Sequence, residues 1–345
     1  MKDLVKKLID THSLSLLEYE KLLCDRNDDD MKIIREEAVK LRKEIYGKKV
    51  YIRGLIEFTN YCKNNCYYCG IRCANRNAER YRLTEEEILT CCDMGYNLGF
   101  RTFVLQGGED PYFDDDRLTN IVRRIREKYK DVAITLSVGE RTKESYEKLF
   151  EAGANRYLLR HETADIEHYR KLHPESMSYE NRINCLKVLK DIGYQVGAGF
   201  MVGSPYQSNK TLAEDLKFIE EFKPDMCGIG PFIPHKDTIF KDEKAGGLEL
   251  TLFLLSVIRI IHPPVLLPAT TALGTIDKKG REKGIEAGAN VVMPNLSPVN
   301  VRDKYLLYDN KICTGDEAAE CINCMKRRVE SVGYEVVIER GDVSQ

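Results

Sequence analysis

The sequence has no apolar stretch near the roughly 20 residues that a membrane-spanning helix requires. Its N-terminal stretch, MKDLVKKLIDTHSLSLLEYEKLL, mixes charged residues with helically spaced apolar ones and lacks a secretory apolar region and cleavage site. Basic and acidic residues nearly cancel, at a net charge of -2, so no surface of one sign is expected for nucleic acid or membrane. These absences predict a cytoplasmic protein that binds neither nucleic acid nor a membrane.

Low-complexity tracts, linkers and visible internal repeats are also missing. The chain has 345 residues, of which 43% are hydrophobic and 31% charged, as in an ordinary globular protein. This length suits one large α/β barrel or two smaller domains.

Short β-rich runs alternate with amphipathic helical stretches after an expected helical segment at 1–48. The alternation predicts a complete parallel (β/α)8 TIM-type barrel at 49–298, followed by a C-terminal extension at 299–345. A doubly wound open sheet is the alternative. The expected strands are 51–58, 102–106, 132–138, 156–160, 195–201, 226–230, 264–270 and 290–294.

Polar and Gly-rich segments follow these runs, including QGGEDP, SVGE, RHETA, MVGSP and ATTALGT. Active sites of TIM-type barrels lie at the C-terminal ends of the strands. A structural barrel would not need polar residues at every such end, so the pattern predicts an enzyme. No Ser–His–Asp set or other acid–base set is apparent among these segments.

Twelve cysteines are many for a cytoplasmic chain, where clustered thiols indicate metal ligands more often than disulfides. Cys62, Cys66 and Cys69 form a C-x3-C-x2-C motif directly after the first expected strand. Zinc sites usually recruit two cysteine pairs, and this motif has one. Four-iron clusters take four ligands, so three thiolates would leave one iron open. Cys73 as a fourth ligand is the less favoured alternative.

The motif, with Tyr68 before its last cysteine, resembles that of the radical S-adenosylmethionine (SAM) superfamily. Further blocks, including LQGGEDPY, AGANRYLLRHETA, GIGPFIPHKDT and PATTALGT, resemble the HydE family of [FeFe]-hydrogenase maturases, with methylornithine synthase and biotin synthase as relatives. The resemblance implies a [4Fe-4S] cluster whose open iron binds the methionine end of SAM, and an oxygen-sensitive radical enzyme. The residues implied to bind the cofactors, besides the three cysteines, are Tyr68, Gln106, Gly107, Thr135, Ser137, Glu162, Arg182 and Met201.

One of these positions departs from the family pattern, because Gly107 stands where a serine is usual. The resemblance also implies a substrate site across the barrel mouth. Arg156 and Arg160 are four apart on one expected strand and should point the same way, which suits an anionic substrate. A buried ion pair with Glu57, Glu140 or Glu162 is the alternative. The full set implied is Arg156, Arg160, Thr270, Thr271, Met293, Tyr305 and Tyr308.

A second cysteine group, Cys313, Cys321 and Cys324, predicts an auxiliary [2Fe-2S] or [4Fe-4S] cluster. The resemblance implies that this cluster is not required for catalysis, because some maturases of the family lack these cysteines. The family implies a small anionic complex of iron with cysteine, CO and cyanide as substrate. It also implies an electron donor such as ferredoxin or flavodoxin, a companion radical SAM tyrosine lyase and a GTPase scaffold. Two alternatives stay open: a methylornithine synthase-like mutase, and an iron–sulfur scaffold or electron carrier without SAM cleavage.

Overall fold

A computed structural model describes residues 1–312 and 322–344 of the chain. Its largest sheet has six parallel strands in the order β2-β3-β4-β5-β6-β8. Every residue of β2 is buried, because helices cover the sheet outside and side chains fill it inside. The strands are β2 (Gly54–Thr59), β3 (Thr102–Gly107), β4 (Ala133–Ser137), β5 (Arg156–Leu158), β6 (Gln195–Ala198) and β8 (Met226–Cys227).

Two smaller sheets and isolated bridges complete the barrel wall. β1 (Lys49–Ile52) lies between β10 (Val291–Val292) and β11 (Glu335–Val337), and all three are parallel. β7 (Met201–Val202) pairs with β9 (Gly230–Pro231). Single parallel bridges join Leu55 to Asn295, Met226 to Leu266 and Pro268 to Val291. The strand order therefore runs around a barrel, but ladder hydrogen bonds do not close it into a continuous ring.

Several expected strands differ from the structure: 195–201 is divided between β6 and β7, and 226–230 between β8 and β9, which belong to different sheets. The run 264–270 forms only isolated bridges, since Pro264 and Pro268 have no N–H to donate to a ladder. The run 51–58 is divided at Arg53 between β1 and β2, which belong to different sheets.

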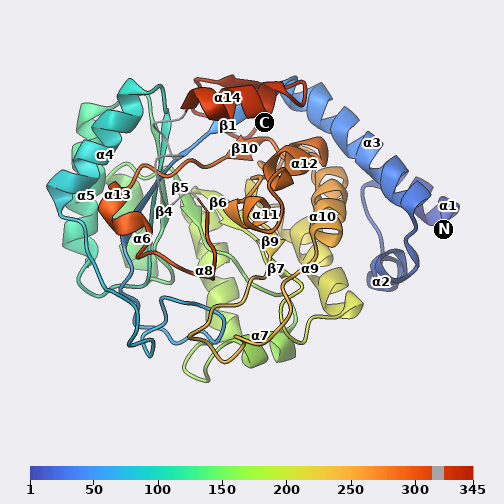
Figure 1. Cartoon of the computed structure of the whole chain (residues 1–345), viewed down its shortest axis with the longest axis horizontal. Helices are drawn as coiled ribbons and strands as arrows, with labels where there is room; N and C mark the ends of the chain where they lie inside the picture. The colour runs from blue at the N-terminus through green and yellow to red at the C-terminus, as the bar shows by residue number, and fades with distance from the viewer. Residues whose placement is uncertain (313–321, 345) are drawn as a thin grey trace.

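Helices surround the strands, as the expected alternation requires (Figure 1). Their starts are fixed by side-chain caps: Thr84 and Glu87 form a capping box at α4, and Thr142 caps α6. Gly193, at a φ of 106°, ends α8 as the sequence suggests. The outer helices are α4 (Glu85–Asn97), α5 (Asp115–Lys128), α6 (Lys143–Glu151), α8 (Tyr179–Ile192), α9 (Asn209–Phe222), α10 (Leu248–Ile261) and α12 (Gly280–Glu286).

The expected N-terminal helices are α1 (Lys2–Thr11), α2 (Leu16–Asp25) and α3 (Asp28–Tyr46). α2 packs on α9, and α3 packs on α10. The contact with α3 explains why almost all of α10 is apolar and buried. Shorter helices are α7 (Ile166–Leu172), α11 (Thr271–Ile276), α13 (Val299–Arg302) and α14 (Ile322–Glu330). No helix among the described residues is long and apolar enough to cross a membrane.

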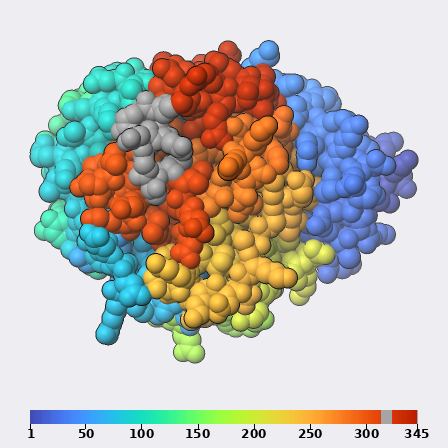
Figure 2. All heavy atoms as spheres, in the orientation of Figure 1, coloured from blue at the N-terminus to red at the C-terminus, as the bar shows by residue number. Residues whose placement is uncertain are grey.

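The C-terminal extension lies beside the N-terminal helical segment, where red and blue regions adjoin (Figure 2). The guanidinium of Arg42 on α3 lies 3.9 Å from the ring centroid of Tyr334, just before β11. Since β11 pairs with β1, the C-terminal extension forms part of the barrel wall. The division of the chain at residues 48 and 298 stays a prediction.

Candidate active site

A cavity of about 370 Å³ opens at the C-terminal ends of the barrel strands. It is lined by the Cys62–Cys69 loop after β2, by the ends of β3, β4 and β5, and by segments after β9 and β10. The predicted site residues that line it are Cys62, Cys66, Tyr68, Cys69, Gln106, Gly107, Ser137, Arg160, Glu162, Arg182, Met201, Thr270, Thr271, Met293, Tyr305 and Tyr308.

The cysteine loop is held by its own backbone and by the chain that follows α13. The Cys69 N–H donates to the Cys66 carbonyl at 3.3 Å, and the Gly70 N–H donates to the Leu307 carbonyl at 2.9 Å. A Cβ at Gly70 would lie 2.2 Å from the Leu306 carbonyl oxygen, so only glycine fits there without a shift. The loop conformation therefore depends on glycine directly after the third cysteine.

The three thiols line one cavity, where their surroundings disfavour the thiolate form unless a cation is bound. Burial raises the pKa of the Cys69 thiol to about 12, and it raises the pKa values of Cys62 and Cys66 as well. Neighbouring thiolates add to the rise in each case, so a positive cluster would be needed to keep all three deprotonated. Cys73 is exposed and does not line the cavity.

The described side chains contain no group of three that converges on a single ion position. In a four-iron cluster each thiolate binds its own iron, so the three sulfurs do not need to meet at one point.

Charged side chains gather beside the cysteine loop. The Arg182 Nε lies 2.6 Å from Glu140 Oε1, and an Arg182 N–H donates to the Arg160 carbonyl at 3.2 Å. Arg160 Nη2 lies 3.2 Å from Glu162 Oε2. The Arg182 Nε and Glu162 Oε2 are buried in these ion pairs without a well-directed hydrogen bond. An acceptor and a guanidinium side by side suit the ammonium and carboxylate of an amino acid.

The backbone at Glu162 is unusual, with a φ of 67° in the left-handed region. Its N–H donates to the Gly199 carbonyl at 3.0 Å, which connects the end of β5 with the segment between β6 and β7. A non-glycine residue in this region is uncommon and often marks a functional site. The fold therefore holds the Glu162 carboxylate at the cavity wall.

Tyr68 is fixed by His173. The Tyr68 hydroxyl lies 3.1 Å from His173 Nε2, and the two rings meet edge to face. His173 Nδ1 lies 2.9 Å from the Tyr169 carbonyl and donates to it. His173 Nε2 therefore accepts a hydrogen bond from the Tyr68 hydroxyl. Burial lowers the pKa of His173 to about 3, so the imidazole is neutral and the acceptor role is maintained.

Gly107 allows a close approach that the usual serine would disturb. A Cβ at this position would lie 2.7 Å from Thr59 Cγ2, a contact that requires a local shift. Gly107 is therefore matched to the packing of its neighbour strand β2 in this chain.

Arg156 and Thr135 do not line the cavity, unlike the residues predicted with them. The prediction that Arg156 reaches the substrate side is wrong. Arg156 begins β5 and Arg160 follows it, so their separation of four positions places Arg156 roughly 13 Å nearer the base of the barrel. Thr135 lies two residues before Ser137 on β4, on the same face but deeper.

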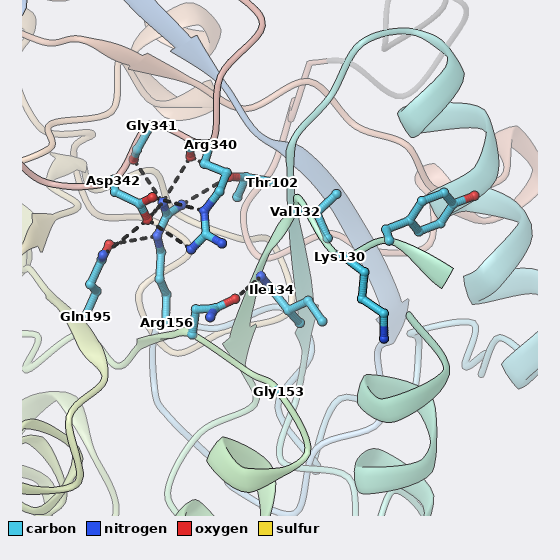
Figure 3. A network of polar contacts seen from close by, with 12 residues as sticks. Thr102, Lys130, Val132, Ile134, Gly153, Arg156, Gln195, Arg340, Gly341 and Asp342 are labelled. Atoms are coloured by element: carbon cyan, nitrogen blue, oxygen red, sulfur yellow. Dashed lines mark hydrogen bonds and ion pairs between the residues drawn. The ribbon is translucent and has the colours of Figure 1, made fainter. Parts of the chain in front are cut away.

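Arg156 instead joins the C-terminal extension to the barrel base (Figure 3). Its guanidinium lies 2.6 Å from Asp342 Oδ1 and donates to the Arg340 and Gly341 carbonyls, both at 3.0 Å. It also donates to Gln195 Oε1 at 2.9 Å. The carboxylate partners weighed from the sequence were Glu57, Glu140 and Glu162, and the observed partner is none of them.

Among the charged residues of the cavity wall that escaped the sequence-based assignment are Glu57 and Lys311. They form an ion pair at 2.5 Å with side chains 2% and 7% exposed, respectively. The only available signals were the position of Glu57 in the first strand and of Lys311 beside Cys313. Neither signal places the two side chains together.

The auxiliary cluster falls largely outside the described residues, since Cys313 and Cys321 are not among them. Cys324 lies in α14, where its Sγ accepts from Arg327 Nη2 at 3.3 Å. The auxiliary cluster stays a prediction.

Comparison with known proteins places this geometry in context. Residues 56–219 match the family model described as the radical SAM superfamily. The chain is 49% identical over 296 residues to the [FeFe] hydrogenase maturase subunit HydE of Thermotoga maritima, covering 86% of this chain and 84% of that protein. It is 31% identical to 3-methylornithine synthase of Methanosarcina barkeri, covering 95% and 91%.

Solved structures agree with these sequence matches. The crystal structure of methylornithine synthase (PylB) has a TM-score of 0.83 at 30% identity and covers 97% of both chains. That of HydG, titled a maturase of the [FeFe]-hydrogenase, has a TM-score of 0.80 at 22% identity, covering 98% of this chain and 76% of the other. These matches confirm the predicted TIM-type barrel of parallel strands and outer helices and exclude the doubly wound alternative.

Proposed function

Because the chain belongs to the radical SAM superfamily, and within it to the family of the maturase HydE, we propose that it cleaves SAM reductively during [FeFe]-hydrogenase maturation. The observation that carries the proposal is the three-thiol loop at the mouth of a cavity that also holds Glu162 and Arg182. Membership of the superfamily implies a [4Fe-4S] cluster and SAM as cofactors.

When bound, the cluster supplies the electron that splits the SAM sulfonium and releases a 5′-deoxyadenosyl radical. Cys62, Cys66 and Cys69 hold the cluster and leave one iron without a protein ligand. Tyr68, fixed by His173, forms the wall beside Cys69.

The remaining cofactor residues orient SAM. Arg182 binds its carboxylate with a planar guanidinium, and Glu162 accepts from its ammonium or ribose hydroxyls. Met201 would pack on the adenine, and Gln106, Gly107 and Ser137 of the cavity wall would contact the bound cofactor. Their joint task is to fix the reacting groups and to exclude water and oxygen.

The substrate in this proposal is a small anionic complex of iron with cysteine, CO and cyanide. Arg160 supplies positive charge at the cavity, and Thr270, Thr271, Met293, Tyr305 and Tyr308 complete the wall around the complex. The companion tyrosine lyase would supply the complex, a ferredoxin or flavodoxin would supply electrons, and the GTPase scaffold would receive the product. The matches to HydE and HydG support such a maturation system.

Anaerobic reconstitution with iron and sulfide, followed by reduction and an assay for 5′-deoxyadenosine with SAM, tests the proposal. The wild-type protein should form the product, Cys66→Ala should abolish it, and Cys321→Ala should preserve it. Absence of product from the wild-type protein would leave an iron–sulfur scaffold or carrier as the better description. Loss in both variants would contradict the division into catalytic and auxiliary cysteines.

A methylornithine synthase-like activity is the second candidate, favoured by the match to that enzyme over nearly the whole chain. Incubating the reduced protein with SAM and L-lysine separates the two. Formation of 3-methylornithine would support the mutase, and stimulation of SAM cleavage only by the iron complex would support the maturase.

A further inference from the structure

The Glu57–Lys311 ion pair places a second positive group in the active-site cavity, away from the arginines beside the cysteine loop. Lys311 Nζ lies 2.5 Å from Glu57 Oε1, and both side chains are nearly closed to bulk solvent. Both residues nevertheless line the cavity. The ammonium therefore faces the ligand space and not the outer surface.

Other groups fix Glu57 and so fix the lysine. Asn295 Nδ2 donates to Glu57 Oε2 at 2.9 Å, and the Glu57 N–H donates to Ser297 Oγ at 2.7 Å. Lys311 also donates to the Tyr305 carbonyl at 2.8 Å. With each Glu57 oxygen engaged and two acceptors on the ammonium, its position is set before any ligand binds.

One N–H of the lysine is not used by these contacts. An ammonium has three N–H groups, and within residues 1–312 and 322–344 the hydrogen bonds of Lys311 go to Glu57 and Tyr305. The Tyr305 ring lies below it, with its centroid 4.9 Å from Nζ. The remaining N–H belongs to a side chain that lines the same cavity as Gln106.

The two charged regions differ in what they can offer. Beside the cysteine loop, Arg160 pairs with Glu162 and Arg182 pairs with Glu140, so guanidiniums and carboxylates are both presented. At Lys311 the carboxylate that pairs with it within residues 1–312 and 322–344, Glu57, already accepts a hydrogen bond on each oxygen. The Lys311 region therefore presents donors, which suits an anion more than a zwitterion.

We propose that Lys311 is a substrate-positioning residue whose free N–H binds an acceptor atom of the anionic substrate, with Glu57 holding the ammonium in place. This inference rests on the proposed function and adds a residue that fixes the substrate relative to SAM. Lys311 thereby contributes to selection of an anionic substrate.

A purely structural tether is the competing explanation, because Lys311 also joins the segment after α13 to β2. The two explanations differ in their readouts. If Lys311 is only a tether, its replacement should weaken the binding of SAM and of the substrate alike and lower thermal stability. If it is a positioning residue, its replacement should weaken substrate binding selectively.

The test uses cluster-loaded protein with SAM and a synthetic ferrous complex of cysteine, CO and cyanide. Calorimetry without reductant measures the dissociation constants of SAM and of the complex for the wild-type, Lys311→Met and Lys311→Arg proteins. Lys311→Met should raise the dissociation constant of the complex about tenfold or more, as expected for loss of a charged hydrogen bond. Lys311→Arg should retain part of the wild-type affinity for the complex. The dissociation constant of SAM should change less than about threefold in both variants.

Lys283→Met is the matched control, because Lys283 pairs with Asp277 at 2.8 Å far from the cavity lining. It should leave both dissociation constants as in the wild-type protein. If Lys311→Met does not fold or load its cluster, Lys311→Gln, which keeps an N–H donor toward Glu57, takes its place with the same expectation.

An unchanged dissociation constant of the complex in these variants would overturn the inference, as would an equal loss for SAM and complex. Either result would leave the proposed function intact, provided that the wild-type protein forms 5′-deoxyadenosine. A wild-type protein that forms none would overturn the proposed function and this inference together.

Discussion

Replacing Asp342 by asparagine should destabilise the base of the barrel. Asp342 is the carboxylate that contacts the fully buried Arg156 guanidinium, at 2.6 Å. The other acceptors of Arg156 are Gln195, Thr102 and two carbonyls, all of them neutral. Asparagine keeps an acceptor oxygen at the site but removes the charge that balances the guanidinium.

The magnitude follows from burial. Removing one partner of a fully buried ion pair costs about 3–5 kcal/mol. The Asp342 side chain is 39% exposed, so water screens part of the interaction. We expect a loss of about 1–2 kcal/mol, or a midpoint of thermal unfolding lower by roughly 2–4 °C.

The pH dependence has a definite sign. Burial tends to raise the pKa of Asp342, but Arg156 and Arg340 outweigh it and the net pKa is lowered. A lowered carboxyl pKa stabilises the fold above the unfolded value of about 4, and this contribution is lost as pH falls through the folded value. The difference between wild type and Asp342→Asn should be constant from about pH 5 to 8 and shrink below about pH 4.

Thermal unfolding of both proteins at several pH values, followed by circular dichroism, measures this difference. Glu339→Gln is the control in the same segment, because Glu339 pairs with Lys49 at 2.7 Å with both side chains more than 40% exposed, at 45% and 43%. It should change the midpoint little. Equal midpoints for Asp342→Asn and wild type at pH 7 would refute the reasoning.

Three further outcomes are expected. Gly70→Ala should reduce iron incorporation, since a Cβ there meets a backbone carbonyl, whereas Gly247→Ala, with open space around the Cβ, should not; iron and sulfide analysis after reconstitution decides. The unfolded chain binds a proton near pH 6.5 that the folded His173 does not bind until about pH 3, so this residue contributes a loss of stability below pH 6.5 of at most about 1.4 kcal/mol per pH unit, and His173→Gln should reduce the slope in thermal unfolding by up to that amount. Arg182→Lys loses the planar fork and should raise the SAM dissociation constant about tenfold by calorimetry; an unchanged value would remove Arg182 from the cofactor site.

Much of the cavity was predictable because barrel topology gathers strand ends. Residues that follow parallel strands, such as Gln106, Glu162 and Thr270, must meet at one end whatever the details of packing. The cysteine loop follows the first of these strands for the same reason. Local spacing and strand order were sufficient for this part of the site.

Depth along a strand and the path of the C-terminal extension were not predictable in this way. The period of two fixes the face of Arg156 but not its height, so its place at the base was missed. Asp342 and Lys311 reach their partners through segments whose course depends on tertiary packing. The run 264–270 was read as a strand from its apolar residues, although its prolines limit it to single bridges.

The account rests on an iron that protein side chains leave free for SAM. Electron–nuclear double resonance on the reduced, reconstituted protein with SAM labelled in its amino and carboxylate groups measures this directly. We expect couplings from both labels to the cluster, and the same couplings in Cys73→Ala. A cluster with no coupling to labelled SAM, or one lost when Cys73 is replaced, would contradict the account.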